Sequence, residues 1–120
     1  EYRMELVPSE LYKIIDPAQR WPLALTELKV VHAVAGIGFP QRFFDTLQAL
    51  GFQCIPHAFS DHHRFSASDI DFTDFPVIMT AKDAVKCKAF ADDRHWCLEV
   101  RVEVDEQFLS NLTEEFESLF

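Results

Sequence analysis

One short stretch of the chain concentrates the side chains that could do acid/base or metal chemistry. Residues 55–65 read IPHAFSDHHRF and hold three histidines, His57, His62 and His63, together with Asp61. A histidine changes charge near neutral pH, so one of these imidazoles could transfer a proton or orient another catalytic group. Surface or packing roles for all three are the alternative. Adjacent loop histidines do not follow a recognised zinc-ligand spacing, so we expect no metal site here.

Two further segments carry residue types that could meet a phosphate. Gly36 and Gly38 lie between a strand-like run and a helix-like run, and free N–H groups at a helix N-terminus favour anions. A dinucleotide-binding fingerprint has a small residue where Gln41 stands, so tight-turn glycines are the competing interpretation. Lys82 lies at the start of a second predicted helix and could also contact a phosphate, although Asp83 beside it is explained as a helix cap.

These segments need elements that bring them together. Hydrophobic periodicity predicts alternating strands and helices. The predicted strands are residues 29–35, 52–59, 75–79 and 95–104, and the predicted helices are residues 40–50, a short one from 66, 80–90 and 105–120. This alternation predicts a three-layer α/β/α sandwich with a mostly parallel, Rossmann-like sheet of about four strands. In such sheets ligands bind beyond the carboxyl ends of the strands, where all three segments fall. The strict apolar–charged alternation of residues 95–104 predicts a half-exposed strand near a sheet edge.

The first 28 residues have a different character. We interpret residues 1–28 as a linker or entry arm and residues 29–120 as one α/β domain. The arm is expected to hold a short strand at Arg3–Val7, a short helix around Glu10–Ile15 and an anchoring Trp21. Because a strand-like run begins at once, without an initiator Met, we expect the chain to be a piece of a longer protein.

Composition excludes several classes of function. The formal net charge of −9, from 20 acidic and 11 basic residues, argues against nucleic-acid binding and against a polybasic membrane patch. No apolar run approaches the roughly 18–20 residues that span a bilayer. The three cysteines are scattered without a CxxC pair, which is typical of reduced, buried thiols in a cytoplasmic protein.

Three longer motifs resemble the tetraacyldisaccharide 4′-kinases, the lipid A 4′-kinases of Gram-negative bacteria. They are HAVAGIGFPQRFFDTLQALGF (His32 to Phe52), HAFSDHHRFS (His57 to Ser66) and VIMTAKDAVKCKAF (Val77 to Phe90), in the order and spacing of that family's C-terminal half. The resemblance implies transfer of the ATP γ-phosphate to the 4′-hydroxyl of a tetraacyldisaccharide 1-phosphate lipid in lipopolysaccharide biosynthesis. It also implies a peripheral enzyme at the cytoplasmic face of the inner membrane.

The resemblance places most of the catalytic machinery outside this chain. ATP and Mg²⁺ are implied to bind mainly to an N-terminal P-loop domain of the same polypeptide, which also supplies the catalytic Asp and the membrane contact. No GxxxxGK[ST] pattern occurs in these 120 residues. Phosphoryl transfer requires positioned phosphates, metal and nucleophile. We therefore expect this chain alone to hold no cofactor and to be inactive.

The resemblance also assigns site residues. His62 is implied to pair with the catalytic Asp of the other domain, with Asp61 holding the loop and His63 as its less constrained neighbour. Thr80, Lys82 and Asp83 match a Thr-x-Lys-Asp motif of the family and are implied to face the nucleotide or the cleft. Two departures, Phe39 in place of the usual Asn and Ala81 in place of the usual Glu, are expected to change local hydrogen bonding.

Two other classes of function compete with the kinase interpretation. The first is a metal-dependent phosphoesterase of the Asp-His-His type, but such enzymes need further Asp-bearing motifs at earlier strand ends, and here the first of the α/β strands ends in Gly-Ile-Gly. The second is a Rossmann-like nucleotide-binding module that acts through the Gly36 turn.

Overall fold

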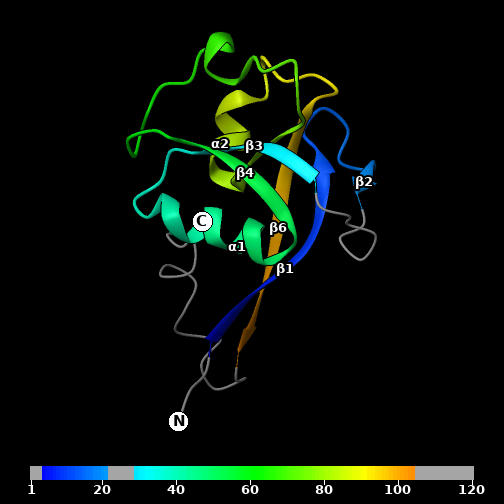
Figure 1. The fold of residues 1–120 in the computed structure, drawn as a ribbon, viewed down its shortest axis with the longest axis vertical. Helices are drawn as coiled ribbons and strands as arrows, with labels where there is room; N and C mark the ends of the chain where they lie inside the picture. Colours follow the sequence, from blue (N-terminus) through cyan, green and yellow to red (C-terminus); the bar gives the residue numbers. More distant parts are fainter. Residues whose placement is uncertain (1–3, 22–28, 105–120) are drawn as a thin grey trace.

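A six-stranded sheet forms the centre of the protein, in a computed structural model that describes residues 4–21 and 29–104 (Figure 1). The strand order is β2-β1-β6-β5-β3-β4. The elements in chain order are β1 (Met4–Lys13), β2 (Arg20–Trp21), β3 (Lys29–Ala35), α1 (Pro40–Ala49), β4 (Phe52–Ala58), the 3₁₀ helix η2 (Ala67–Ile70), β5 (Val77–Met79), α2 (Ala81–Cys87) and β6 (His95–Val104).

Four neighbouring strands are parallel, as the alternating pattern predicts. β3 pairs with β4 on one side and β5 on the other, and β5 pairs with β6. β3 is buried from Val31 to Ala35 because its apolar run is covered on both faces. Pro56 lies within β4, where it is tolerated because β4 is the edge strand of the sheet.

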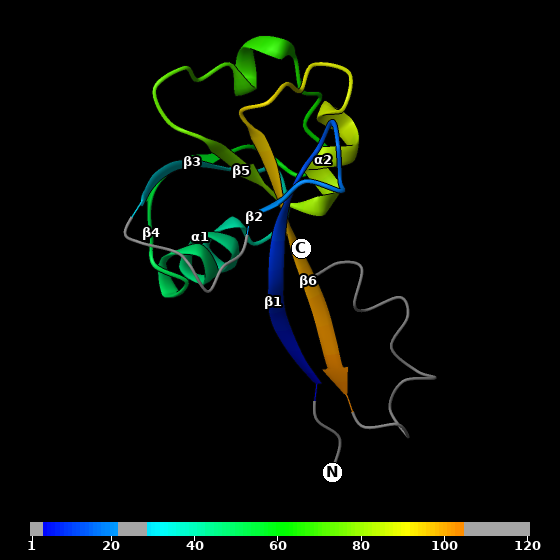
Figure 2. The same ribbon diagram turned by 90° about the vertical axis from the view of Figure 1, so that its right-hand side faces the viewer.

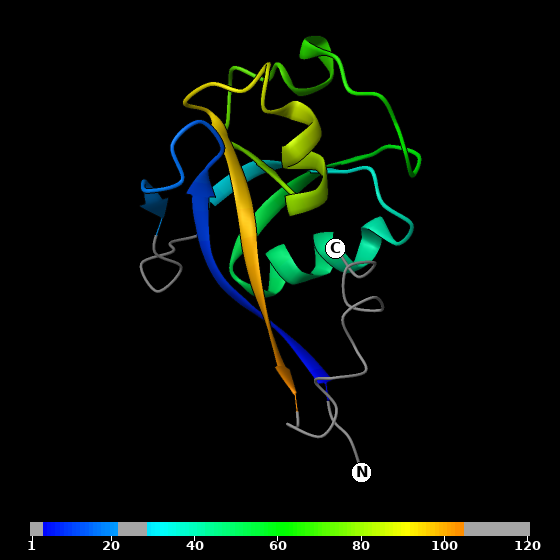
Figure 3. The same ribbon diagram turned by 180° about the vertical axis from the view of Figure 1, so that it is seen from behind.

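Helices cover both faces of this sheet, which confirms the three-layer α/β architecture. α1 packs on one face through Phe43, Phe44 and Leu47, and Ala84 and Cys87 of α2 belong to a second apolar cluster on the opposite face. Figure 2 shows the two helices on opposite sides of the strands, and Figure 3 shows α2 lying across the face seen from behind. The strand and helix periodicities in the sequence thus correctly predicted the layers.

The entry arm departs from the expected helix. The predicted short helix around Glu10–Ile15 is wrong, because β1 continues as a strand to Lys13. Leu11 is completely buried and pairs with Trp21 of β2 and with Leu98 of β6. Tertiary pairing therefore outweighs the local helical signal. Trp21 does anchor the arm, with its ring in edge contact with Phe52 and Trp96.

The predicted edge position of the last strand is also wrong. β6 spans His95–Val104 as expected, but it lies between β5 and β1, with β1 antiparallel to it. The face opposite Trp96 and Leu98 is not solvent-exposed at this end, since His95 and Cys97 are both fully buried. The alternating pattern of residues 95–104 does not reveal that β1, in the entry arm, pairs with β6 along its outer side. Figures 2 and 3 show the two strands extending together beyond the helices.

Smaller differences concern element lengths. α2 ends at Cys87 rather than Phe90, and β5 begins at Val77 rather than Phe75. η2 begins with the predicted capping box, in which Ser66 and Asp69 bond each other's backbone amides. The predicted helix over residues 105–120 lies outside the described residues.

Candidate functional site

Three candidate segments meet at one edge of the sheet. The ends of the parallel strands are in register, with Ala35 of β3 opposite Ala58 of β4 and Val34 opposite Met79 of β5. The loops that follow these strands therefore emerge side by side. Two contacts close the arrangement, since the Asp83 carboxylate reaches the Gly36 amide and Lys82 reaches Asp61. The site is thus assembled as the parallel topology predicts.

A buried carboxylate holds the glycine turn. The backbone N–H of Gly36 donates to Asp83 Oδ2 at 2.8 Å, and the Thr80 hydroxyl donates to the same oxygen at 2.6 Å. Thr80 Oγ1 in turn accepts from the Asp83 amide at 3.1 Å and caps α2. A Cβ at Gly36 would lie 3.1 Å from the ring of Phe65 and 3.2 Å from Asp83 Oδ1, so any larger residue would have to displace these side chains. Gly38, by contrast, is exposed with open space around its Cα.

This network bears on the cofactor predictions. An amide that donates to Asp83 is not free to donate to a phosphate, so the Gly36 turn offers an anion no donor there. Thr80 is 1% exposed and Asp83 is 0% exposed, which leaves Lys82 as the member of that motif which solvent reaches. Nucleotide contact by these residues stays a prediction. A nucleotide-binding module at the glycine turn would have to use amides other than that of Gly36.

The Asp-His-His turn presents His62 to solvent. The turn is closed by the His63 amide donating to the Ser60 carbonyl at 3.0 Å. His62 has a φ of 65°, in the left-handed region that few residues other than glycine adopt, and its side chain is 84% exposed. Its Nε2 lies 3.8 Å from Asp61 Oδ2. The ring is therefore held outward by backbone geometry, with no packing around it.

Asp61 ties this turn to α2. Its Oδ1 accepts from Lys82 Nζ at 3.3 Å and from the His62 amide at 3.1 Å. The hydrogen bond from Lys82 is the main reason why the pKa of the Asp61 carboxyl lies below its usual value. Asp61 is thus charged at neutral pH, and its two hydrogen bonds connect the turn to α2.

The prediction that His63 is the less constrained neighbour is wrong. Its ring stacks on Phe59 with centroids 4.6 Å apart and meets the edge of Phe65. Its Nε2 lies 3.0 Å from Asp69 Oδ2. His63 therefore packs inward between Phe59 and Phe65, while the adjacent His62 points outward.

A second group of histidines was not predicted as a network, although His32 is a buried residue with partners on both ring nitrogens, as a histidine inside a core strand should be. His32 Nδ1 lies 2.8 Å from His57 Nε2, and His32 Nε2 lies 2.7 Å from Asp74 Oδ1. The ring of Phe72 stacks on both imidazoles. Burial is the main cause that lowers the pKa of His57, followed by the charge of His32. A histidine in the middle of an apolar strand run was the available signal.

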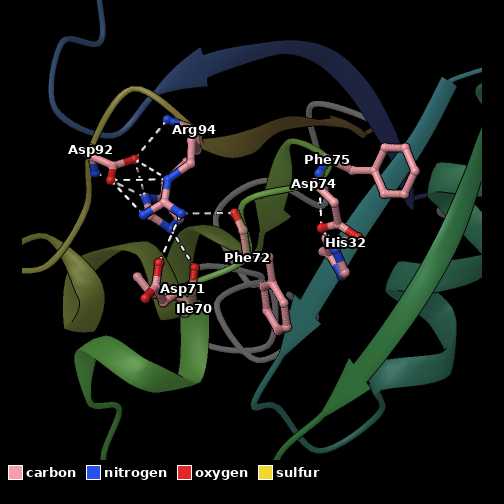
Figure 4. Close-up of polar contacts among 9 residues, drawn as sticks. His32, Ile70, Asp71, Phe72, Asp74, Phe75, Asp92 and Arg94 are labelled. Carbon is pink, nitrogen blue, oxygen red and sulfur yellow. Dashed lines mark hydrogen bonds and ion pairs between the residues drawn. The ribbon is translucent and has the colours of Figure 1, made fainter.

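The loop that carries Asp74 and Phe72 is fixed from its other side. Figure 4 shows Asp74 reaching the ring of His32 at one end of this loop and Arg94 bound to Asp92 at the other. Arg94 donates to Asp71 at 2.9 Å and to the Phe72 carbonyl at 3.0 Å. His95, the residue next to Arg94, is fully buried, with Nε2 2.7 Å from the Ile70 carbonyl.

No group of three or more His, Cys, Asp or Glu side chains among residues 4–21 and 29–104 is arranged to hold a metal ion.

The thiols in the described ranges are unpaired, and burial raises the pKa of Cys87 to about 12 and that of Cys97 to about 11. Phe39, one of the two family departures, precedes α1 as its N-cap, is 75% exposed and makes no side-chain cap. The described edge therefore offers an exposed imidazole, a cation and a charged positioning carboxylate.

Known proteins match the chain over most of its length. Residues 1–117 match the sequence model of the tetraacyldisaccharide-1-P 4′-kinase family. A tetraacyldisaccharide 4′-kinase of Methylobacillus flagellatus is 46% identical over 93% of this chain and 35% of its own length. One of Pseudomonas fluorescens strain Pf0-1 is 59% identical over 82% of this chain and 30% of its own. The chain thus spans about a third of the length of these relatives.

A solved structure has a similar fold. The crystal structure of LpxK from Aquifex aeolicus, titled an "apo" form in complex with ATP, matches with a TM-score of 0.56 and 18% identity. The match covers 99% of this chain and 36% of that one. With a family match over nearly the whole sequence and relatives above 40% identity, the chain belongs to the tetraacyldisaccharide-1-P 4′-kinase family.

Proposed function

We propose that this chain is the C-terminal α/β domain of a two-domain kinase that transfers the ATP γ-phosphate to the 4′-hydroxyl of a tetraacyldisaccharide 1-phosphate. Residues 29–120 would form the domain and residues 1–28 the arm that leads into it. The acceptor assignment rests on the names of the relatives, which are tetraacyldisaccharide 4′-kinases. The other domain of the same polypeptide would be its main partner.

The observation that carries this proposal is the exposed, outward ring of His62, whose one described charged neighbour is Asp61 at 3.8 Å. A self-contained acid/base site surrounds its histidine with groups that fix its tautomer, as Asp74 and Phe72 surround His32. His62 has none of these and is held outward at a φ of 65°. In the proposed enzyme its partner is a catalytic Asp of the other domain, which accepts the proton of the 4′-hydroxyl while His62 orients it.

The residues of this chain fit a minor role toward the nucleotide. When bound, ATP with Mg²⁺ supplies the transferred phosphoryl group and neutralises the charge that develops on it. The sequence has no P-loop, and of the Thr-x-Lys-Asp motif Lys82 is the solvent-accessible cation. Lys82 is the group that would approach a phosphate when the two domains close, at the cost of its 3.3 Å contact with Asp61. The chain alone would be inactive.

The proposed enzyme works on a lipid substrate, so the proposal also concerns its relation to the membrane. None of the helices in the described ranges is long and apolar enough to cross a bilayer. We place the enzyme as a peripheral protein at the cytoplasmic face of the bacterial inner membrane, with membrane contact through the other domain. The abundance of acidic residues fits this assignment, because anionic lipid headgroups would repel this domain.

The test is the substitution His62→Ala in the full-length protein, assayed with ATP and a tetraacyldisaccharide 1-phosphate. We expect kcat to fall by about 100-fold or more, the range of a lost acid/base or orienting group, with the thermal unfolding temperature unchanged. His63→Ala is the matched control on the adjacent residue, and it should cost stability more than turnover. Unchanged turnover in His62→Ala would refute the role of His62, and an inactive wild-type protein would refute the kinase itself.

A further inference from the structure

A hollow of about 500 Å³ lies beside the Asp-His-His turn, and no role has been given to it above. It is lined by His62, His63, Arg64, Phe65 and Lys86. Two of these are permanently cationic, two are imidazoles and none is acidic. This is unusual for a chain with 20 acidic and 11 basic residues.

The two cations of the hollow differ from most others in the described part of the chain. Lys13, Arg20, Lys82 and Arg94 each form an ion pair with a described carboxylate. Within residues 4–21 and 29–104, Arg64 and Lys86 form none, and neither do Lys29, Arg42 and Lys88, which lie outside the hollow. In an acidic protein, cations that gather at one hollow without carboxylates leave a local positive field for an external anion.

Lys86 is the stronger of the two observations. Its Nζ is buried, and no described atom accepts a hydrogen bond from it. An ammonium carries three donors, and leaving them unsatisfied away from water is costly. Asp61 bonds Lys82, and Asp69 bonds His63 and the Ser66 amide. Asp83, one turn earlier on α2, has a buried Oδ1 that is likewise without a partner, and it forms no ion pair with Lys86. An anion in the hollow would supply the missing acceptor.

We infer that this hollow binds the phosphate group of a phosphate monoester or phosphoanhydride. A tetrahedral dianion accepts hydrogen bonds from several directions at once, which suits donors from the turn (His62, Arg64) and from the last turn of α2 (Lys86). A planar carboxylate has fewer acceptor directions. The site rests on the proposed function for its two candidate sources, the 1-phosphate of the lipid acceptor and a phosphate of ATP.

Binding there would also serve the turn itself. His62 belongs to the lining and is otherwise held by the backbone alone. A phosphate bridging Lys86 and Arg64 would connect α2 to the turn and fix the position of the His62 ring. The hollow is thereby both a substrate subsite and the means by which a bound substrate orders the histidine.

The test compares full-length protein with its Lys86→Met variant, which keeps the length of the side chain and removes its charge. Calorimetry with inorganic phosphate and with glucosamine 1-phosphate should show binding weakened by about tenfold or more in the variant. Lys86→Arg should retain binding, and acetate should bind far more weakly than phosphate. Lys88→Met is the control for a general loss of charge. Lys88 lies two residues after Lys86, is exposed and does not line the hollow, so this variant should bind phosphate like the wild type.

Kinetics then identify the source of the phosphate. If the lipid 1-phosphate occupies the hollow, Lys86→Met raises KM for the lipid about tenfold and leaves KM for ATP unchanged, and an ATP phosphate reverses this pattern. Equal phosphate affinity and unchanged KM values in a folded Lys86→Met protein would overturn the proposal. A wild-type protein that binds phosphate through Lys86 without kinase activity would instead overturn the proposed function and leave this site standing.

Discussion

Two histidine regions of the protein have opposite construction. The buried network joins Asp74, His32 and His57 through contacts of 2.7 and 2.8 Å under the ring of Phe72. The exposed turn holds His62 at a φ of 65°, with the one described carboxylate nearby at 3.8 Å. In the first region both ring nitrogens of His32 have partners within the described chain, and in the second the ring of His62 is left open to solvent.

The contrast separates stability from function. A buried, bonded imidazole contributes to folding because removing it leaves polar partners unsatisfied. An exposed imidazole in a strained backbone contributes little to folding, and such strain persists where the surroundings hold it in place, often at functional sites. We therefore expect substitutions in the two regions to separate, with losses of stability in the first and losses of activity in the second.

The largest expected difference is between His32→Ala and His62→Ala in the free energy of unfolding. His32→Ala removes the partner of both Asp74 and His57 and the surface on which Phe72 stacks, so we expect a loss of about 3 kcal/mol. His62→Ala should change stability by less than about 0.5 kcal/mol. Urea denaturation followed by circular dichroism measures both. Equal losses in the two variants would remove the distinction between the regions.

A smaller effect should come from the backbone of the turn. A β-branched side chain is strongly disfavoured at a positive φ, so His62→Val should destabilise the protein by about 1 kcal/mol. His62→Asn and His62→Gly, which tolerate this conformation, should remain close to the wild type. The same denaturation experiment decides the matter. If the valine variant were as stable as the asparagine variant, the ring of His62 would not be held outward by a left-handed backbone.

The smallest expected effect is a loss of folding stability as the pH falls below neutrality. The pKa of His57 lies below the usual 6.5, chiefly because of burial, so the unfolded chain takes up this proton at a higher pH than the folded one. Stability should therefore be flat above pH of about 6.5 and should fall as the pH drops from there toward the folded pKa. The carboxyl of Asp74, whose pKa is lowered by its bond to His32, adds a further loss only below its ordinary value of 3.8.

The variant His57→Gln tests this assignment, because it should flatten the decline between about pH 6.5 and 5. His62→Gln should keep the decline, because it leaves His57 and its burial unchanged. Thermal unfolding at a series of pH values measures both profiles. A decline that survives His57→Gln and disappears in His62→Gln would reverse the comparison.

Much of the fold could be predicted because local patterns coincide with the tertiary structure. The run from Lys29 to Ala35 is apolar on both faces because both faces are buried, and Phe43, Phe44 and Leu47 mark the buried stripe of α1. In the entry arm, the helix predicted around Glu10–Ile15 is wrong for the opposite reason. Its residues form a strand only because β6 and β2 pair with them, and pairing over such a sequence distance leaves no local signal.

The candidate site divides in the same way. The sequence by itself determined which residue types could do chemistry, that they follow parallel strands, and through its motifs the family to which the chain belongs. Only the tertiary structure decided that His62 faces outward while His63 packs on Phe59, that Asp83 occupies the amide of Gly36, and that Lys86 opens onto the same hollow as Arg64. The physical reason is that residue type and strand order follow from local periodicity, whereas the direction of a side chain and its partners depend on packing between segments far apart in the chain.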